Sequence, residues 1–168
     1  MKWASFATNP PSFTNTNFNP PVLTKVQKSG LRYEKRAQEY LRKLCNEAGG
    51  FTCLCNPWLM YSPVGSSSST VFFCQPDCLF VSSDGSKITI IEIKLSHTGD
   101  SWKQIRQLYE PVLRKIYPAA AFAAVEVCKW FDPHTAFPET FYYAENVLLA
   151  ETNRFGMHIY KPRGKTGA

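Results

Sequence analysis

Residues 76–95, PDCLFVSSDGSKITIIEIKL, decide how this chain folds. They contain the end of one β-rich run (residues 71–82) and the whole of a second (residues 87–95). Asp84-Gly85 between the runs is typical of a tight hairpin turn, because such turns need residues that tolerate positive φ. If this pair is the centre of the turn, directly opposed residues have numbers that sum to 84 + 85 = 169. This register holds for any loop of even length.

The hairpin register predicts a pair of facing carboxylates. Asp77 and Glu92 sum to 169, so their Cβ atoms are expected about 4.5 to 5.5 Å apart. Like charges in this position destabilise a hairpin, and a bound Mg²⁺ would offset them because it prefers carboxylate oxygens. Alternation along the second strand places Lys94 on the same face as Glu92. The alternative is two exposed ladder residues beside a surface lysine.

The segments around the hairpin predict an α/β fold. Apolar residues at helical spacing predict helices over 29–48 and 101–117, and Pro111 must kink the second helix or begin another piece. Residues 119–130 are mostly apolar, as expected of a strand that is buried on both faces. We expect 51–61 to be strand-like, 141–149 to be mixed and 155–160 to form a last strand. The order helix, three strands, helix, strand predicts a mixed central β-sheet flanked by helices.

The hairpin residues resemble a known signature. Pro76-Asp77, followed by Glu92-Ile93-Lys94, is similar to the motif of the PD-(D/E)XK nuclease superfamily, and the resemblance covers residues 29–130. It implies a restriction-endonuclease-like αβββαβ core and hydrolysis of phosphodiester bonds with Mg²⁺, for which Mn²⁺ can substitute. It also implies that Asp77, Glu92 and the Ile93 carbonyl hold the metal and that Lys94 is the catalytic lysine.

Two further candidates follow from the same resemblance. Many members of the superfamily place a glutamate on the first helix, and Glu34 resembles it, although a solvated helix residue is the alternative. Some branches carry a glutamine on the helix after the Glu-x-Lys strand. Gln104 and Gln107 are neighbours on such a helix, and Gln107 is the preferred candidate. An ordinary polar helix face is the alternative.

The formal net charge is 19 − 13 = +6. Many of the basic residues lie on the two predicted helices, where they can contact phosphates without reading sequence. The predicted nucleic-acid contacts are Lys35, Arg36, Lys103, Arg106 and Gln104. Charge alone is weak support, since a solvated basic helix has the same composition. With the hairpin between the helices, DNA is the expected partner.

Composition sets the expected boundaries and compartment. We expect an irregular N-terminal arm (1–24), a single domain (25–160) and a basic C-terminal tail (161–168). No run is long and apolar enough for a membrane helix, and Met1-Lys2-Trp3 begins no signal peptide, so a cytoplasmic protein without membrane contact is expected.

The spacing of Cys53-Leu54-Cys55 is one residue tighter than the usual zinc pair. The cysteines are therefore predicted to be buried free thiols.

Together these features predict a Mg²⁺-dependent nuclease that is directed by DNA structure or ends in repair, recombination or phage DNA processing. Its small size and the need to handle two strands suggest a homodimer. The alternative is a non-catalytic nucleic-acid-binding module with the same fold.

Overall fold

A computed structural model describes residues 1–8, 22–65, 70–97, 99–130, 141–143 and 155–161. The helical segments are α1 (Lys25–Ala48), α2 (Asp100–Gln104), the π-helix η1 (Ile105–Tyr109) and α3 (Glu110–Ile116). The strands are β1 (Trp3–Phe6), β2 (Phe51–Cys55), β3 (Leu59–Ser62), β4 (Phe72–Cys74), β5 (Cys78–Ser82), β6 (Lys87–Ser96), β7 (Ala121–Trp130), β8 (Phe141–Tyr143) and β9 (Phe155–Ile159).

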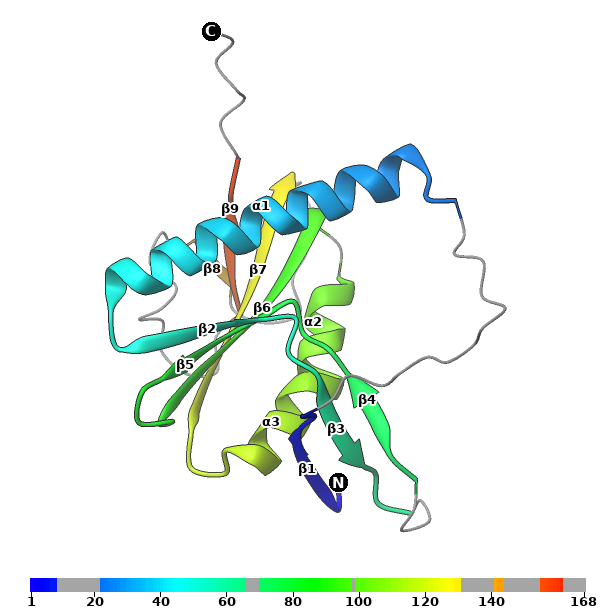
Figure 1. Cartoon of the computed structure of the whole chain (residues 1–168), viewed down its shortest axis with the longest axis vertical. Helices are drawn as coiled ribbons and strands as arrows, with labels where there is room; N and C mark the ends of the chain where they lie inside the picture. Colours follow the sequence, from blue (N-terminus) through cyan, green and yellow to red (C-terminus); the bar gives the residue numbers. More distant parts are fainter. Residues whose placement is uncertain (9–21, 66–69, 98, 131–140, 144–154, 162–168) are drawn as a thin grey trace, which may run out of the picture.

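A mixed sheet forms the centre of the molecule, with strand order β2-β5-β6-β7-β9-β8 (Figure 1). Strands β2, β5 and β6 are antiparallel, whereas β7 lies parallel to β6. The β5–β6 hairpin has the predicted register, because Cys78 pairs with Ile91 and Val81 with Ile88. Gly85 in its turn has φ 70°, which glycine adopts without strain. The prediction of a mixed α/β fold is confirmed.

The helices cover opposite faces of this sheet (Figure 1). Alternation along β6 separates the two cores: Ile91 and Ile93 pack with residues of α1, whereas Ile88 and Ile90 pack with residues of α3. Helix α1 begins at Lys25, four residues before the predicted start at residue 29. The Thr24 side chain accepts a hydrogen bond from the Gln27 backbone, and the Gln27 side chain accepts one from the Thr24 backbone. This capping box fixes the earlier start.

The second predicted helix is divided, as Pro111 suggested. Proline has no N–H to donate to the carbonyl four residues earlier, so a regular α-helix cannot pass through it. The chain instead makes the π-helical turn η1, in which the Glu110 N–H bonds to the Ile105 carbonyl. Helix α3 then begins with Pro111 in its first turn. The wider turn changes which side chains face the sheet.

The N-terminal segment corrects the prediction of an irregular arm. Trp3–Phe6 forms strand β1, which pairs antiparallel with β3 and completes a second sheet of order β1-β3-β4. The Phe6 ring packs edge-on against Tyr117, so this sheet is anchored beside α3. Low charge and several prolines suggested irregularity, but the aromatic residues provide the apolar contacts that hold a strand.

Three other predictions have partial outcomes. The run 71–82 is two strands, β4 and β5, because the chain leaves one sheet at Cys74 and enters the other at Cys78. Strand β9 confirms the last predicted strand, and within 141–149 only β8 is described. Residues 9–21 of the arm and 162–168 of the tail lie outside the described residues. Among the helices in the described ranges, none has the length and apolar character required to cross a membrane.

Candidate active site

The predicted carboxylate pair lies where β5 ends its pairing with β6. Cys78–Ile91 is the last pair of the ladder, so Asp77 and Glu92 occupy the next position of the same register. The Ile93 N–H donates to Asp77 Oδ2 at 2.7 Å, which joins the two strands at this point. Pro76 would face Ile93 if the ladder continued, but proline has no N–H to offer the Ile93 carbonyl. Asp77 and Glu92 are therefore close enough for the charge of Asp77 to raise the pKa of Glu92, with Ile93 beside them.

Lys94 lies beside this pair. Its Nζ donates to Glu92 Oε2 at 2.9 Å and to Gln104 Oε1 at 3.0 Å. The Lys94 side chain is 27% exposed and that of Glu92 2%, so a buried carboxylate meets a cation that still reaches solvent. Strand β6 and helix α2 thus hold the ammonium group in place from two sides.

The carboxylates are held in an environment that disfavours their charge. Burial raises the pKa of Glu92 to about 7, and the nearby charge of Asp77 adds to the rise, whereas Lys94 opposes it. Burial also raises the pKa of Asp77, against the Ile93 hydrogen bond and Lys94. For Lys94, burial lowers the pKa, but the carboxylates of Glu92 and Asp77 outweigh it and the net shift is upward. The site therefore favours a bound cation or proton.

This raised pKa predicts how the stability of the metal-free protein depends on pH. Between the ordinary pKa of 4.5 and the folded value of about 7, Glu92 holds a proton in the folded state that it loses on unfolding. The free energy of unfolding in EDTA is therefore expected to fall as pH rises through this window, by about 3 kcal/mol. Urea unfolding across this pH range measures it.

Glu92→Gln is expected to remove the part of this fall that Glu92 contributes, because the amide does not titrate. Glu47→Gln, at an exposed position of α1, is the matched control and should keep the wild-type slope. If the free energy of unfolding of Glu92→Gln falls with pH as steeply as that of the wild type, the pKa of Glu92 is not raised in the folded protein.

Helix α1 brings Glu34 to the same site. Burial and the charge of Asp77 raise the pKa of Glu34, while Lys94 and a hydrogen bond with Asn56 lower it. Gln38, one turn later, donates to Glu34 Oε1 at 3.3 Å and to Asn56 Oδ1 at 3.0 Å. An open pocket of about 320 Å³ lies between Glu34 on α1 and Lys94 on β6. Glu34 is thus part of the site rather than only a solvated helix residue.

The two glutamine candidates are separated by the structure. Gln104 accepts a hydrogen bond from Lys94, whereas Gln107 is exposed. The preference for Gln107 is corrected, because α2 ends at Gln104 and the π-helical turn carries Gln107 away from the strand. Gln104, predicted as a nucleic-acid contact, instead holds Lys94.

Glu126 and His97 are neighbours of the site. The position of His97, three residues after Lys94, predicts either an approach to a phosphate or an ordinary loop histidine, whereas Glu126 was not predicted. Glu126 on β7 pairs in register with Glu92, and its side chain is fully buried. Its Oε1 lies 2.8 Å from His97 Nδ1, and the His97 side chain is only 2% exposed. Burial raises the pKa of Glu126, and the contact with His97 opposes the rise. The sequence feature that could have pointed to Glu126 is that it is the single acid within the apolar run 119–130.

The carboxylate set fits a small hard cation. Glu92 Oε1 and Glu126 Oε2 are buried without a hydrogen-bond partner among the described residues, although such oxygens are costly to leave unpaired. Asp77 uses Oδ2 for the Ile93 N–H, so its other oxygen can face a cation. Glu34 and Glu126 do not join the pair in a compact set of three ligands. Two carboxylates fit Mg²⁺, which keeps several waters.

Three of the predicted nucleic-acid contacts are exposed on the helices that carry site residues. Lys35 and Arg36 are exposed on α1 next to Glu34, and Lys103 is exposed next to Gln104. Arg106 is instead paired with the buried Glu110, which also binds Arg114. This ion pair joins η1 to α3, and the nucleic-acid contact of Arg106 stays a prediction. Arg36 also contributes to a pocket of about 250 Å³, whose lining is Ser29, Arg32, Tyr33, Arg36, Leu95 and Lys129.

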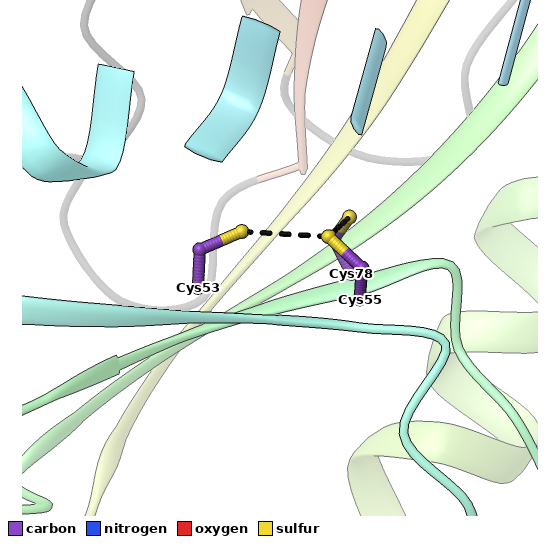
Figure 2. A group of neighbouring side chains, drawn as sticks. All are labelled: Cys53, Cys55 and Cys78. Carbon is purple, nitrogen blue, oxygen red and sulfur yellow. Dashed lines mark hydrogen bonds between the residues drawn. The ribbon is translucent and has the colours of Figure 1, made fainter. Parts of the chain in front are cut away.

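The cysteines form no disulfide among the described residues, as predicted, but three of them gather under α1 (Figure 2). Cys53 and Cys55 are only half-buried, whereas Cys78 is fully buried. The predicted burial is therefore wrong for Cys53 and Cys55.

Comparison of the chain with protein-family models, with curated proteins and with solved structures gives no match. The functional assignment therefore depends on the geometry of the site and on the sequence resemblance.

Proposed function

We propose that this protein is a metal-dependent nuclease that hydrolyses phosphodiester bonds in DNA. The observation that carries the proposal is the convergence of Asp77, Glu92 and Lys94 at one end of the β5–β6 hairpin. Lys94 donates to the buried carboxylate of Glu92, and the carboxylate of Asp77 accepts the N–H of Ile93, the residue between them. Exposed ladder residues would not be buried or arranged in this way.

The order of elements supports the same proposal. Helix α1, strands β2, β5 and β6, the α2–α3 segment and β7 follow one another as in a restriction-endonuclease-like core, with β3 and β4 inserted. The third and fourth of these strands, β6 and β7, are parallel and are joined by the helical crossover. The candidate residues lie directly before β5, on β6, on α1 and on α2.

The chemistry assigns a separate role to each group. Asp77, Glu92 and the Ile93 carbonyl would hold Mg²⁺, which supplies an activated water and neutralises charge on the phosphate. Lys94 keeps a positive charge beside the carboxylates and can donate a hydrogen bond to the attacking water or to a phosphate oxygen. Gln104 fixes the direction of the Lys94 ammonium group. Glu34, on the pocket opposite Lys94, can orient a water.

The charge of the chain supports a nucleic acid as substrate. Exposed Lys35, Arg36 and Lys103 lie next in sequence to site residues on α1 and α2, where phosphates on either side of the scissile bond would pass. These contacts read the backbone and not the bases. We therefore propose recognition of DNA structure or ends, in repair, recombination or phage DNA processing.

A cleavage assay tests the proposal. Purified protein is incubated with single-stranded, duplex and branched DNA, and with RNA, in Mg²⁺, in Mn²⁺ or in EDTA. We expect DNA products in the presence of either metal and none in EDTA. Binding without cleavage of any substrate would overturn the enzyme assignment and favour a non-catalytic DNA-binding module.

The two glutamines give a paired test of the positioning role. Gln104→Ala is expected to lower kcat about tenfold, because a hydrogen bond to a charged group is worth roughly 1.5 to 3 kcal/mol. KM and Mg²⁺ affinity should stay close to wild type, since Gln104 acts through Lys94. Gln107→Ala, three residues away and exposed, is the control and should leave kcat unchanged. Equal losses in the two variants would contradict the assignment.

A further inference from the structure

Three cysteine side chains meet beneath α1, on the sheet face opposite to Glu92 (Figure 2). Cys53 and Cys55 are two residues apart on β2, so their side chains leave the same face of the strand. Cys78 is the direct partner of Cys55 in the β2–β5 ladder. Strand geometry, rather than a loop, therefore brings the three thiols together.

The spacing of the sulfur atoms matches a thiophilic metal site. Sγ of Cys55 lies 3.7 Å from that of Cys53 and 3.3 Å from that of Cys78, and all three atoms lie within 4.8 Å of one another. A Zn–S bond of about 2.3 Å with tetrahedral angles places two sulfurs about 3.8 Å apart. Small rotations of the cysteine side chains would therefore suffice to bind one ion.

The charges around the cluster also fit a metal. Hydrogen bonds with Cys53 and Cys78, together with the charge of Arg42 on α1, lower the pKa of the Cys55 thiol, whereas the hydrogen bonds among the three thiols raise the pKa of Cys53 and Cys78. Three thiolates around Zn²⁺ carry a net charge of 2 − 3 = −1, which the Arg42 guanidinium would neutralise. Among the described residues, no other group of three histidine, cysteine or acidic ligand atoms is as compact.

We propose that Cys53, Cys55 and Cys78 bind one Zn²⁺ ion, with the fourth position taken by water. Each thiol that ligates the ion loses its proton to solvent. The usual spacing of two to four residues between zinc-binding cysteines applies where one loop supplies both ligands. Here two adjacent strands supply them, so the tighter spacing of Cys53 and Cys55 does not exclude zinc. This site is separate from the Asp77–Glu92 pair and does not depend on the nuclease activity.

The position of the cluster indicates a bracing role. The metal would join the end of β2 to the start of β5, directly before Asn56 and directly after Asp77. The Asn56 N–H bonds to the Asp77 carbonyl at 2.9 Å, so the same two segments are in contact. Bound zinc would therefore hold in place the backbone that carries Asp77.

Cobalt titration tests the proposal on the full chain. Reduced, metal-stripped protein is titrated with Co²⁺, whose thiolate complexes give a near-ultraviolet charge-transfer band that carboxylate complexes lack. We expect the band to saturate at one ion per chain and to disappear when Zn²⁺ is added. Zn²⁺ should also raise the unfolding temperature of the stripped protein.

Serine variants assign the ligands. Cys53→Ser and Cys55→Ser should each lose the band or weaken Co²⁺ binding at least tenfold, and their circular dichroism shows whether they fold. Cys53 is half-buried, so its variant remains informative if Cys78→Ser does not fold. Cys74→Ser, at a buried position in the other core, is the control and should keep the band. Absence of the band in the wild type, or its persistence in Cys53→Ser and Cys55→Ser, would overturn the proposal, whatever the outcome of the nuclease assay.

Discussion

Asp77→Asn is expected to lower Mg²⁺-dependent DNA cleavage by about 10³-fold, because a metal ligand that contributes several kcal/mol to the transition state is lost. Asparagine has the same shape and its side-chain oxygen can still accept the Ile93 N–H, so the hairpin should stay folded. DNA binding should be retained or become tighter, since one negative charge near the phosphates disappears. Single-turnover cleavage, Mg²⁺ titration calorimetry and DNA binding in EDTA measure the three effects.

Asp84→Asn is the matched control for this variant. Asp84 lies in the turn at the other end of the same hairpin, where its carboxylate accepts hydrogen bonds from Ser82 and Ser86. Asparagine keeps an acceptor oxygen, so activity should remain close to wild type. If Asp77→Asn keeps wild-type cleavage and Mg²⁺ affinity, Asp77 is not a metal ligand.

Lys94→Met should lower kcat by about 10² to 10³-fold, the usual cost of removing one donor that stabilises transition-state charge. In contrast to Asp77→Asn, it should keep Mg²⁺ binding, because both carboxylates remain and a competing cation is removed. Loss of Lys94 raises the pKa of Glu92 further above about 7, so Mg²⁺ binding by the two proteins is best compared over a series of pH values from 7 upward. Calorimetry and single-turnover rates separate the two effects.

Lys87→Met, at the exposed start of the same strand, controls for loss of charge on β6. It should leave kcat unchanged and weaken DNA binding slightly at most. If Lys94→Met loses Mg²⁺ affinity as strongly as Asp77→Asn, the lysine supports the metal site instead of the chemistry. Full activity in Lys94→Met would exclude both roles.

The hairpin and its site could be predicted because they depend on local rules. A turn centred on Asp84-Gly85 sets the register of every pair in β5 and β6, and the period of two in a strand places Lys94 beside Glu92. Neither step requires knowledge of the rest of the fold. Glu34, in contrast, was predicted only from the resemblance to the nuclease superfamily, because nothing local to the first helix separates it from a solvated residue.

The remaining parts of the site depend on packing that the sequence does not display. Pro111 signalled a break in the helix, but the π-helical turn that selects Gln104 over Gln107 depends on how α2 and α3 meet the sheet. Glu126 becomes a neighbour of Glu92 only through the parallel pairing of β6 with β7. The three-cysteine cluster likewise requires the β2–β5 pairing, which no local turn specifies.

Anomalous diffraction from crystals of the full chain grown with Mn²⁺ would locate the metal. We expect an ion bound by the carboxylates of Asp77 and Glu92 and by the Ile93 carbonyl, with Lys94 beside it. The same crystals of Asp77→Asn should lack this peak. Wild-type crystals at saturating Mn²⁺ with no anomalous peak between Asp77 and Glu92 would contradict the account.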